Sequence, residues 1–218
     1  MAAATRRTDE DSTRSRILEA ALELFSRQGF AGASMRRLAV AVGLTPSSLY
    51  NHFAGKEAIY HALVDTFGPA GAAERLRSPR FRALGGDPAG FCRLYAEELL
   101  TQWMDPREQR FQELITAERN RLPSVRSHAF STLFIGESGL VADYFRRFAL
   151  AGLIDTSDPQ ETARLFMAGL TFVRLEHFIF PATPSPPAVV RPELARFLRN
   201  FLSLVDARSP TSAAGPGR

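Results

Sequence analysis

The chain has 218 residues, of which 45% are hydrophobic and 23% are charged, and its formal net charge is +4. This length suits one medium domain, or a small domain joined to a larger one, and the near-average composition excludes a disordered, collagen-like or coiled-coil chain. The single cysteine, Cys92, excludes an internal disulfide and a cysteine-based metal cluster.

The sequence predicts neither a membrane-spanning helix nor a signal peptide. The longest run of apolar or small residues, 165–173, is about half of the ~20 residues that a spanning helix needs. Residues 1–16 become acidic where a signal peptide would place its apolar segment. We therefore expect a cytoplasmic protein.

Helical periodicity runs through nearly the whole chain, and a cap residue followed by proline marks four helix starts. These are Thr45-Pro46, Asp87-Pro88, Asp105-Pro106 and Asp158-Pro159. The cap oxygen accepts a hydrogen bond from a free N–H of the first turn, and proline lacks an N–H that would have no partner there. No segment alternates in the manner of a β-hairpin, so we expect an all-α fold.

Four helices are predicted before residue 68, after a flexible arm over residues 1–12. They cover about 13–28, 35–42, 46–53 and 56–67. The first carries apolar residues at helical spacing and is expected to end at Gly29, and the second follows Ser34 and ends at Gly43.

The second part of the chain is also predicted to be helical. Residues 68–90 are rich in Gly, Ala, Arg and Pro and are interpreted as the seam between two parts. Beyond the seam, helices are expected over about 88–104, 106–120, 124–150, 159–179 and 192–207, with a proline-rich loop over 181–190 and a disordered tail over 208–218.

Residues 34–53 follow the helix-turn-helix plan, in which the second helix enters the DNA major groove. Leu49 and Phe53 lie on its inner side, whereas the opposite side carries hydrogen-bonding groups that suit base edges and phosphates. A small helix with a solvated polar face fits the same pattern. Lys56 favours the DNA interpretation, because a cation in the first turn of a helix opposes the helix dipole but can bind phosphate.

The stretch from Ile17 to Leu63 resembles the DNA-binding domain of the TetR family of transcriptional regulators. The segments that carry this resemblance are ILEAALELFSRQGF and LAVAVGLTPSSLYNHFAGKEAIYHAL. The resemblance implies a helix-turn-helix domain over 13–67 and a larger helical domain over 68–207 that binds an effector and forms a homodimer. It further implies a repressor that a small hydrophobic ligand releases from a near-palindromic double-stranded DNA operator. The DNA contacts that it implies are Ser34, Arg36, Thr45, Ser47, Ser48, Tyr50, Asn51, His52 and Lys56.

Bulky aromatic residues are frequent in the second part, where they pack in a core or line a cavity. The candidates for ligand contact are Trp103, Phe111, Phe130, Phe134, Phe166, His128 and His177. The predicted helix over 159–179 is apolar on two sides, and a second subunit would cover the side that the chain's own core does not. The candidates for this dimer interface are Phe172, Leu194, Phe197, Leu198, Phe201 and Leu202.

No catalytic site is predicted. Residues 136–140 approach the nucleophile-elbow pattern, but Leu140 replaces the second glycine and no strand precedes the motif. The histidines form no metal pattern, and no phosphate-binding loop occurs, so no metal or cofactor is expected. The alternative interpretation is a helical small-molecule-binding or enzymatic domain whose N-terminal helices no longer bind DNA.

Overall fold

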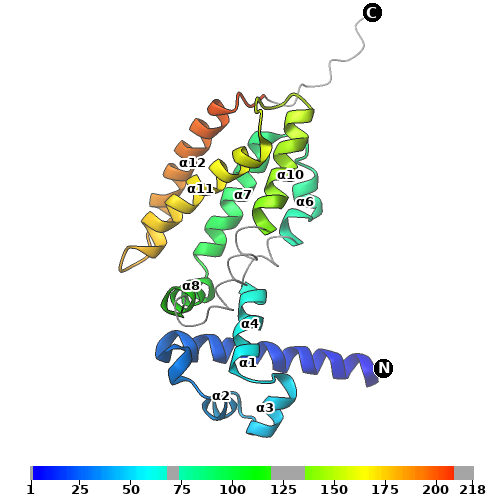
Figure 1. The fold of residues 1–218 in the computed structure, drawn as a ribbon, viewed down its shortest axis with the longest axis vertical. Coiled ribbons are helices and arrows are strands. Elements are labelled where there is room, and N and C mark those ends of the chain that lie inside the picture. Colours follow the sequence, from blue (N-terminus) through cyan, green and yellow to red (C-terminus); the bar gives the residue numbers. More distant parts are fainter. Residues whose placement is uncertain (1, 68–73, 119–135, 209–218) are drawn as a thin grey trace, which may run out of the picture. The chain divides into compact units, whose positions relative to one another are not determined.

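The computed structural model describes residues 2–67, 74–118 and 136–208. These residues form helices and turns without a β-strand, which confirms the all-α prediction. The chain divides into two compact units. Unit 1 comprises Met1–Ala70 and Pro106–Ser131, and unit 2 comprises Gly71–Asp105 and Thr132–Arg218. Figure 1 shows the helices of both units.

Unit 1 is built around one long helix. Its helices are α1 (Ala2–Gly32), α2 (Met35–Val42), α3 (Pro46–His52), α4 (Lys56–Phe67) and α8 (Pro106–Glu118). Helix α1 packs against α2, α4 and α8, and α2 packs against α3. The apolar faces predicted for these helices meet in a buried core that includes Ile17, Phe25, Leu38, Leu49 and Leu63.

Helix α1 differs from its predicted bounds at both ends. It begins at Ala2, so residues 2–12, which we expected to form a flexible arm, have helical backbone. No glycine or proline interrupts the sequence between Ala2 and Gln28, and alanines at its start favour the helix. At Gly29 the backbone leaves helical geometry, with φ 68° and ψ 162°, before a last turn that ends at Gly32. The glycine therefore kinks the helix where we expected it to stop.

Helix α8 belongs to unit 1 although the chain reaches it only after α7. It packs against α1 and α4. Its buried face includes Phe111 and Leu114, and Arg107 forms an ion pair with Glu19 of α1. The predicted domain boundary at residue 68 therefore does not coincide with the division into compact units, because a segment of the second part contributes to the core of the first.

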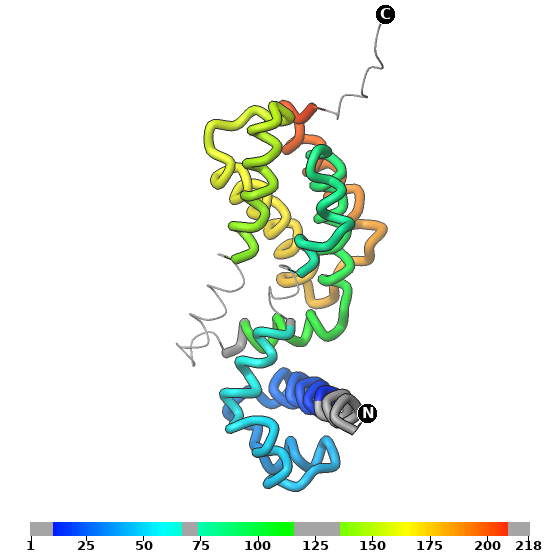
Figure 2. The backbone as a smooth tube through the Cα atoms, turned by 90° about the vertical axis from the view of Figure 1, so that its right-hand side faces the viewer, coloured from blue at the N-terminus to red at the C-terminus, as the bar shows by residue number. Residues whose placement is uncertain are grey.

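Unit 2 is a bundle of helices around an aromatic core. Its helices are α6 (Pro79–Arg82), α7 (Pro88–Trp103), α10 (Glu137–Leu150), α11 (Pro159–Arg174), η2 (Leu175–Ile179, a π-helix) and α12 (Pro187–Leu204). Helix α11 packs against α10 and α12, and α12 also packs against α7. Figure 2 gives a second view of α11 and α12, which lie side by side. Rings of Phe91, Tyr95, Phe145, Phe166 and Phe201 contact one another in the core.

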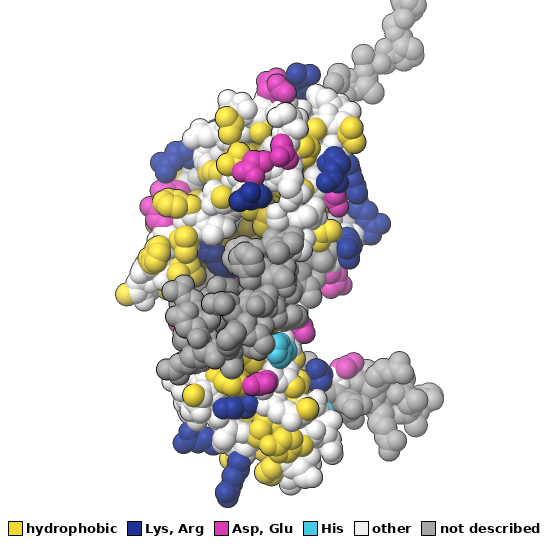
Figure 3. All heavy atoms as spheres, viewed as in Figure 1, with side chains coloured by type: hydrophobic (Ala, Val, Ile, Leu, Met, Phe, Trp, Pro, Cys, Tyr) yellow, Lys and Arg dark blue, Asp and Glu magenta, His cyan; other side chains and the backbone are white. Residues whose placement is uncertain are grey.

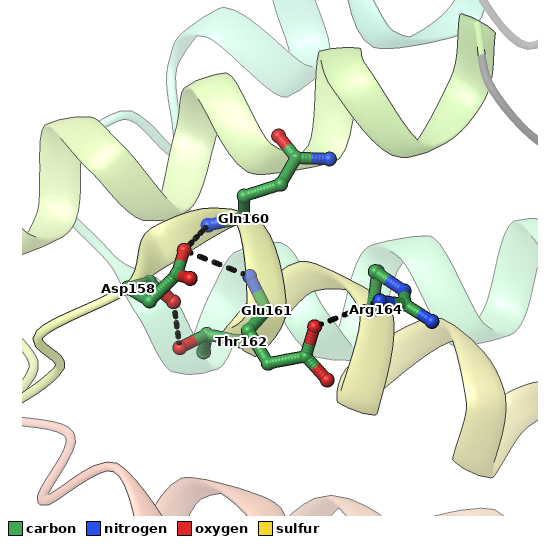
Figure 4. A network of polar contacts seen from close by, with 5 residues as sticks. All are labelled: Asp158, Gln160, Glu161, Thr162 and Arg164. Atoms are coloured by element: carbon green, nitrogen blue, oxygen red, sulfur yellow. Dashed lines mark hydrogen bonds and ion pairs between the residues drawn. The ribbon is translucent and has the colours of Figure 1, made fainter.

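The cap and proline pattern marks helix starts in both units. Asp87 accepts a hydrogen bond from the backbone N–H of Gly90, at 2.8 Å, and α7 follows. Asp158 accepts from the backbone N–H groups of Gln160 and Glu161, at 3.0 and 3.1 Å (Figure 4). Helix α8 likewise begins at Pro106. The starts of α7 and α11 are predicted correctly because their caps satisfy local backbone donors and need no distant partner.

Two helices of unit 2 differ from the predicted ones. Helix α12 begins at Pro187 rather than at residue 192, so the predicted loop over 181–190 is too long. Pro187 suits the first turn, and the interior Pro192 is tolerated in a helix that Val190 and Leu194 anchor in the core. The predicted helix over 159–179 is present, but its last five residues adopt π geometry as η2. The part of the predicted helix 124–150 before residue 136 lies outside the described residues.

None of the helices in the described part of the chain is both long and apolar enough to cross a membrane.

Candidate nucleic-acid interface

Local hydrogen bonds define the helix-turn-helix between Ser34 and Phe53. The Ser34 hydroxyl caps α2 by accepting from the backbone N–H of Arg37, at 3.3 Å. Gly43 ends α2 with a left-handed φ of 71°, a conformation that costs glycine little. Thr45 then caps α3 by accepting from the backbone N–H of Ser48, at 3.1 Å. The predicted turn therefore forms from residues whose side chains or backbone freedom suit it.

Helix α3 has one buried side and one exposed side, as predicted. Leu49 is completely buried, and Phe53, which follows the helix, is buried against the Arg14 guanidinium. Ser47 and Asn51 are exposed, and 53% of the surface of Tyr50 is accessible. An exposed helix face with hydroxyl, amide and phenol groups can donate to and accept from base edges and phosphates.

The remaining predicted contacts are less free than those three. Ser48 is half-buried, and its hydroxyl accepts a hydrogen bond from Thr45, at 3.0 Å. His52 is half-buried, and Ser34 and Thr45 are exposed but already serve as caps. These groups can still contact phosphates, because a hydroxyl that caps a helix keeps a further hydrogen-bonding position.

Helix α2 adds exposed groups beside α3. Arg36 is exposed, as expected of a phosphate contact, and Figure 3 shows basic side chains at the surface of unit 1. Val40, one helical turn after Arg36, is 76% exposed. Val40 is not among the predicted contacts, and it lies outside the buried set of α2, which is Leu38, Ala39 and Val42. An exposed valine on a DNA-facing helix can contact the methyl group of thymine.

Lys56, a predicted phosphate contact, binds backbone carbonyls of its own chain in the structure. Its ammonium group donates to the carbonyl oxygens of Phe30 and Ala33, at 2.6 and 2.8 Å, and lies 4.5 Å from the centre of the Phe30 ring. The cation thus binds the carbonyl end of α1, where the helix dipole favours positive charge. A phosphate contact by Lys56 would require the ammonium group to release these carbonyls.

Two arginines of α1 act in the same way on the other helices of the motif. Arg14 donates to the carbonyl of His52 at the end of α3, at 3.1 Å, and Arg16 donates to the carbonyl of Val42 at the end of α2, at 3.0 Å. Each of these three helix ends is therefore held by a cation from another helix. The sequence reasoning missed this set, because the partners lie 23 to 38 residues apart in the chain.

The four candidate ligand residues in the described part of the chain belong to both units. Trp103, Phe166 and His177 are buried in unit 2, whereas Phe111 is buried in unit 1. Phe166 is a central core residue, with its ring 5.1 Å from that of Phe201. Three other candidates, which are Phe130, Phe134 and His128, lie outside the described residues.

Unit 2 contains a polar cluster that the sequence analysis did not identify. The Tyr95 hydroxyl donates to the Glu137 carboxylate, at 2.7 Å, and Arg75 lies 3.5 Å from the same carboxylate and donates to Gln102, at 3.1 Å. Burial raises the pKa of Glu137, although the hydrogen bond from Tyr95 and the charge of Arg75 oppose this change. Burial and the neighbouring Glu137 also raise the pKa of Tyr95. Such polar groups can orient a ligand in a helical domain.

The candidate dimer residues fall into two groups. Leu194, Leu198 and Phe201 lie in the core of unit 2, where these buried side chains contact other helices of their own chain. Phe172 is 66% exposed, and Phe197 and Leu202 are partly exposed. The main apolar face of α12 packs against α7 and α11. The helical pattern of the sequence shows that this face is apolar, but not whether it contacts the same chain or a second subunit.

Comparison with known proteins supports the interpretation of the N-terminal region. The sequence model described as "Bacterial regulatory proteins, tetR family" matches residues 17–63. The transcriptional regulator UidR of Escherichia coli K12 is 44% identical over 57 residues, which are 26% of this chain and 29% of UidR. The transcriptional repressor AcnR of Corynebacterium efficiens is 38% identical over 52 residues, which are 24% of this chain and 28% of AcnR. The chain thus matches less than a third of the length of these two relatives.

A solved structure extends the similarity of fold over both units. The flavonoid-responsive regulator FrrA is 22% identical, with a TM-score of 0.67, and the match covers 93% of this chain and 100% of FrrA. At this identity the match shows a shared fold: an N-terminal helix-turn-helix followed by a larger helical part.

Proposed function

We propose that this chain, whose residues 17–63 carry the DNA-binding domain of the tetR family of bacterial regulatory proteins, is a transcriptional repressor that a small ligand releases from DNA. The observation that carries the proposal is the exposed polar face of α3, formed by Ser47, Tyr50 and Asn51 on a buried Leu49. UidR and AcnR are transcriptional regulators, and AcnR carries the name of a repressor. Binding to chromosomal DNA implies action in the cytoplasm.

Recognition rests on α3 in the major groove and on phosphate contacts around it. Tyr50 and Asn51 reach base edges, while the Ser34 and Thr45 hydroxyls and Arg36 bind phosphates on either side. Two copies related by a two-fold axis place two such helices about 34 to 36 Å apart, one turn of DNA. The operator is therefore a near-palindrome.

Substitutions in α3 test this assignment. Tyr50→Ala and Asn51→Ala each reduce operator affinity by about tenfold or more, since a base contact contributes roughly 1–3 kcal/mol, and they reduce non-specific affinity less. Gln160→Ala, an exposed change at the start of α11, serves as the control. Fluorescence anisotropy with duplex DNA flanking the gene, with and without competitor, measures both affinities. Unchanged operator affinity in both variants would exclude α3 as the recognition helix.

The ligand is proposed to be small and hydrophobic, because the core of unit 2 is aromatic. It releases DNA only if it binds the DNA-free conformation more tightly, and such coupling is typically ~1–3 kcal/mol. The buried cluster of Tyr95, Glu137 and Arg75 provides polar groups for its orientation. FrrA is described as flavonoid-responsive, so flavonoids are a suitable first class of probe.

Trp103 provides the measurement for this part of the proposal. It is buried, with its ring 5.7 Å from that of Phe178 and the Arg174 guanidinium 5.9 Å from its ring centre. A flavonoid or other apolar aromatic compound that binds in unit 2 changes Trp103 fluorescence and lowers operator affinity over the same concentration range. If compounds bind but none alters operator affinity, the chain binds DNA constitutively and the ligand-response proposal fails.

A further inference from the structure

Three side chains at the junction of η2 and α12 place metal-binding atoms close together. Glu176 and His177 are consecutive residues of η2, and Glu193 projects from α12. One nitrogen of His177 and one carboxylate oxygen of each glutamate all lie within 4.8 Å of one another. The helix-turn-helix domain and the polar cluster around Tyr95 do not include any of these residues.

Hydrogen bonds on both ring nitrogens orient His177. Its Nε2 lies 2.9 Å from a carboxylate oxygen of Glu193, and its Nδ1 lies 3.1 Å from the Ser185 hydroxyl. The backbone N–H of Ser185 also donates to the His177 carbonyl, at 2.9 Å. When Nδ1–H donates to Ser185, the lone pair of Nε2 points towards the carboxylates. Histidines that bind metals commonly donate their second N–H to an oxygen in this way.

The charges at this place favour a bound cation. One carboxylate oxygen of Glu193 faces His177, and the other forms an ion pair with Arg196, at 3.4 Å. The structure gives the exposed Glu176 side chain no hydrogen bond or ion pair within the described part of the chain. Two carboxylates this close repel each other, and a divalent cation between them converts the repulsion into attraction.

We propose that Glu176, His177 and Glu193 bind one divalent transition-metal ion, with zinc as the ion of choice. One imidazole nitrogen and two carboxylate oxygens suit zinc, whereas calcium and magnesium prefer sites made of oxygen alone. The ion takes the place of the hydrogen bond between His177 and Glu193 and joins η2 to α12. Three protein ligands leave a fourth position for water. This proposal is independent of DNA binding.

Two isosteric substitutions test the site without removing the buried histidine. Glu176→Gln and Glu193→Gln each remove one charged ligand, and Glu176→Gln leaves every described hydrogen bond in place. Glu161→Gln removes an exposed charge from α11, away from the cluster, and is the matched control. The four full-length proteins are freed of metal with a chelator and dialysed against zinc, and their bound zinc is measured by elemental analysis.

Wild type and Glu161→Gln are expected to bind one zinc per chain at micromolar concentration. The zinc affinity of the other two variants is expected to be lower by about tenfold or more. Zinc is also expected to raise the unfolding temperature of wild type and Glu161→Gln but not that of Glu176→Gln. Cobalt(II) as a second probe should give a visible absorption band that both cluster variants lack. Absence of stoichiometric zinc in wild type, or equal binding by Glu176→Gln, would overturn the proposal.

Discussion

A cation from another helix binds the end of each of the first three helices of unit 1. Arg14, Arg16 and Lys56 each donate to carbonyls at the end of another helix. The last carbonyls of a helix point beyond its end, and the helix dipole favours a positive charge beside them. These basic residues therefore stabilise helix ends within the chain.

Lys56→Ala is expected to destabilise unit 1. The change leaves the carbonyls of Phe30 and Ala33 without their cation, and a hydrogen bond to a charged group contributes about 1.5–3 kcal/mol. Urea denaturation followed by circular dichroism measures the free energy of unfolding. Arg27→Ala, which removes an exposed ion pair with Glu23, is the control and changes stability by less than about 0.5 kcal/mol.

The same variant distinguishes a structural role from a phosphate contact. A lost phosphate contact lowers the slope of log affinity against log salt by about one unit and leaves the stability unchanged. A lost helix cap lowers the stability, but the folded protein keeps the wild-type slope of log affinity against log salt. A variant as stable as wild type with a flatter slope would restore Lys56 to the DNA contacts.

At the scale of elements, a glycine decides how closely α11 and α12 approach. A Cβ atom placed on Gly169 would lie 2.0 Å from a ring atom of Phe197. The Phe197 ring in turn stacks on Phe166 and Phe201, at 6.2 and 6.1 Å between ring centres. Because Gly169 has no side chain, the Phe197 ring of α12 can lie directly against the backbone of α11.

Gly169→Ala is expected to destabilise unit 2 by roughly 1–3 kcal/mol, because Phe197 and its stacked neighbours must shift. Gly139→Ala is the matched control, since Gly139 lies in α10 and a Cβ there meets nothing within 4 Å. The control should stabilise the protein by about 0.5–1 kcal/mol through the higher helix propensity of alanine. Thermal unfolding of both variants beside wild type checks the opposite signs, and equal effects would contradict this account.

At the scale of the whole molecule, the proposed dimer requires an exposed apolar face. Leu165 and Phe172 of α11 are 52% and 66% exposed and lie seven residues apart, on the same side of the helix. Buried residues of α12 such as Leu198 cannot serve as tests, because a charge there disrupts the core of the single chain. The interface is therefore best tested on α11.

Leu165→Glu and Phe172→Glu are expected to give folded monomers that lose operator binding, since a charge at a buried apolar contact costs far more than one in water. Leu150→Glu carries the same change at a position 84% exposed near the end of α10, and it should remain dimeric. Analytical ultracentrifugation measures the state of each protein. A wild-type monomer at micromolar concentration, or dimeric variants of both α11 positions, would contradict the proposed interface.

Local patterns in the sequence determined several of the helix starts and the buried and exposed sides of α3. The Thr45, Asp87 and Asp158 caps and the buried Leu49 followed from short-range rules, because a cap bonds within its own first turn and a helix turns every 3.6 residues. The exposed face of α3 followed in the same way. The resemblance over residues 17–63 added the functional class, which no periodicity contains.

Only the tertiary structure decided which partner each side chain meets. The carbonyls bound by Lys56, the burial of Leu198 in its own chain and the pairing of Glu193 with His177 join residues that lie far apart in the sequence. A helical pattern shows that a face is apolar or charged, but the same pattern serves a core, a subunit interface or a ligand. The tertiary structure resolves this ambiguity, because a face that packs against helices of its own chain is no longer exposed to another partner.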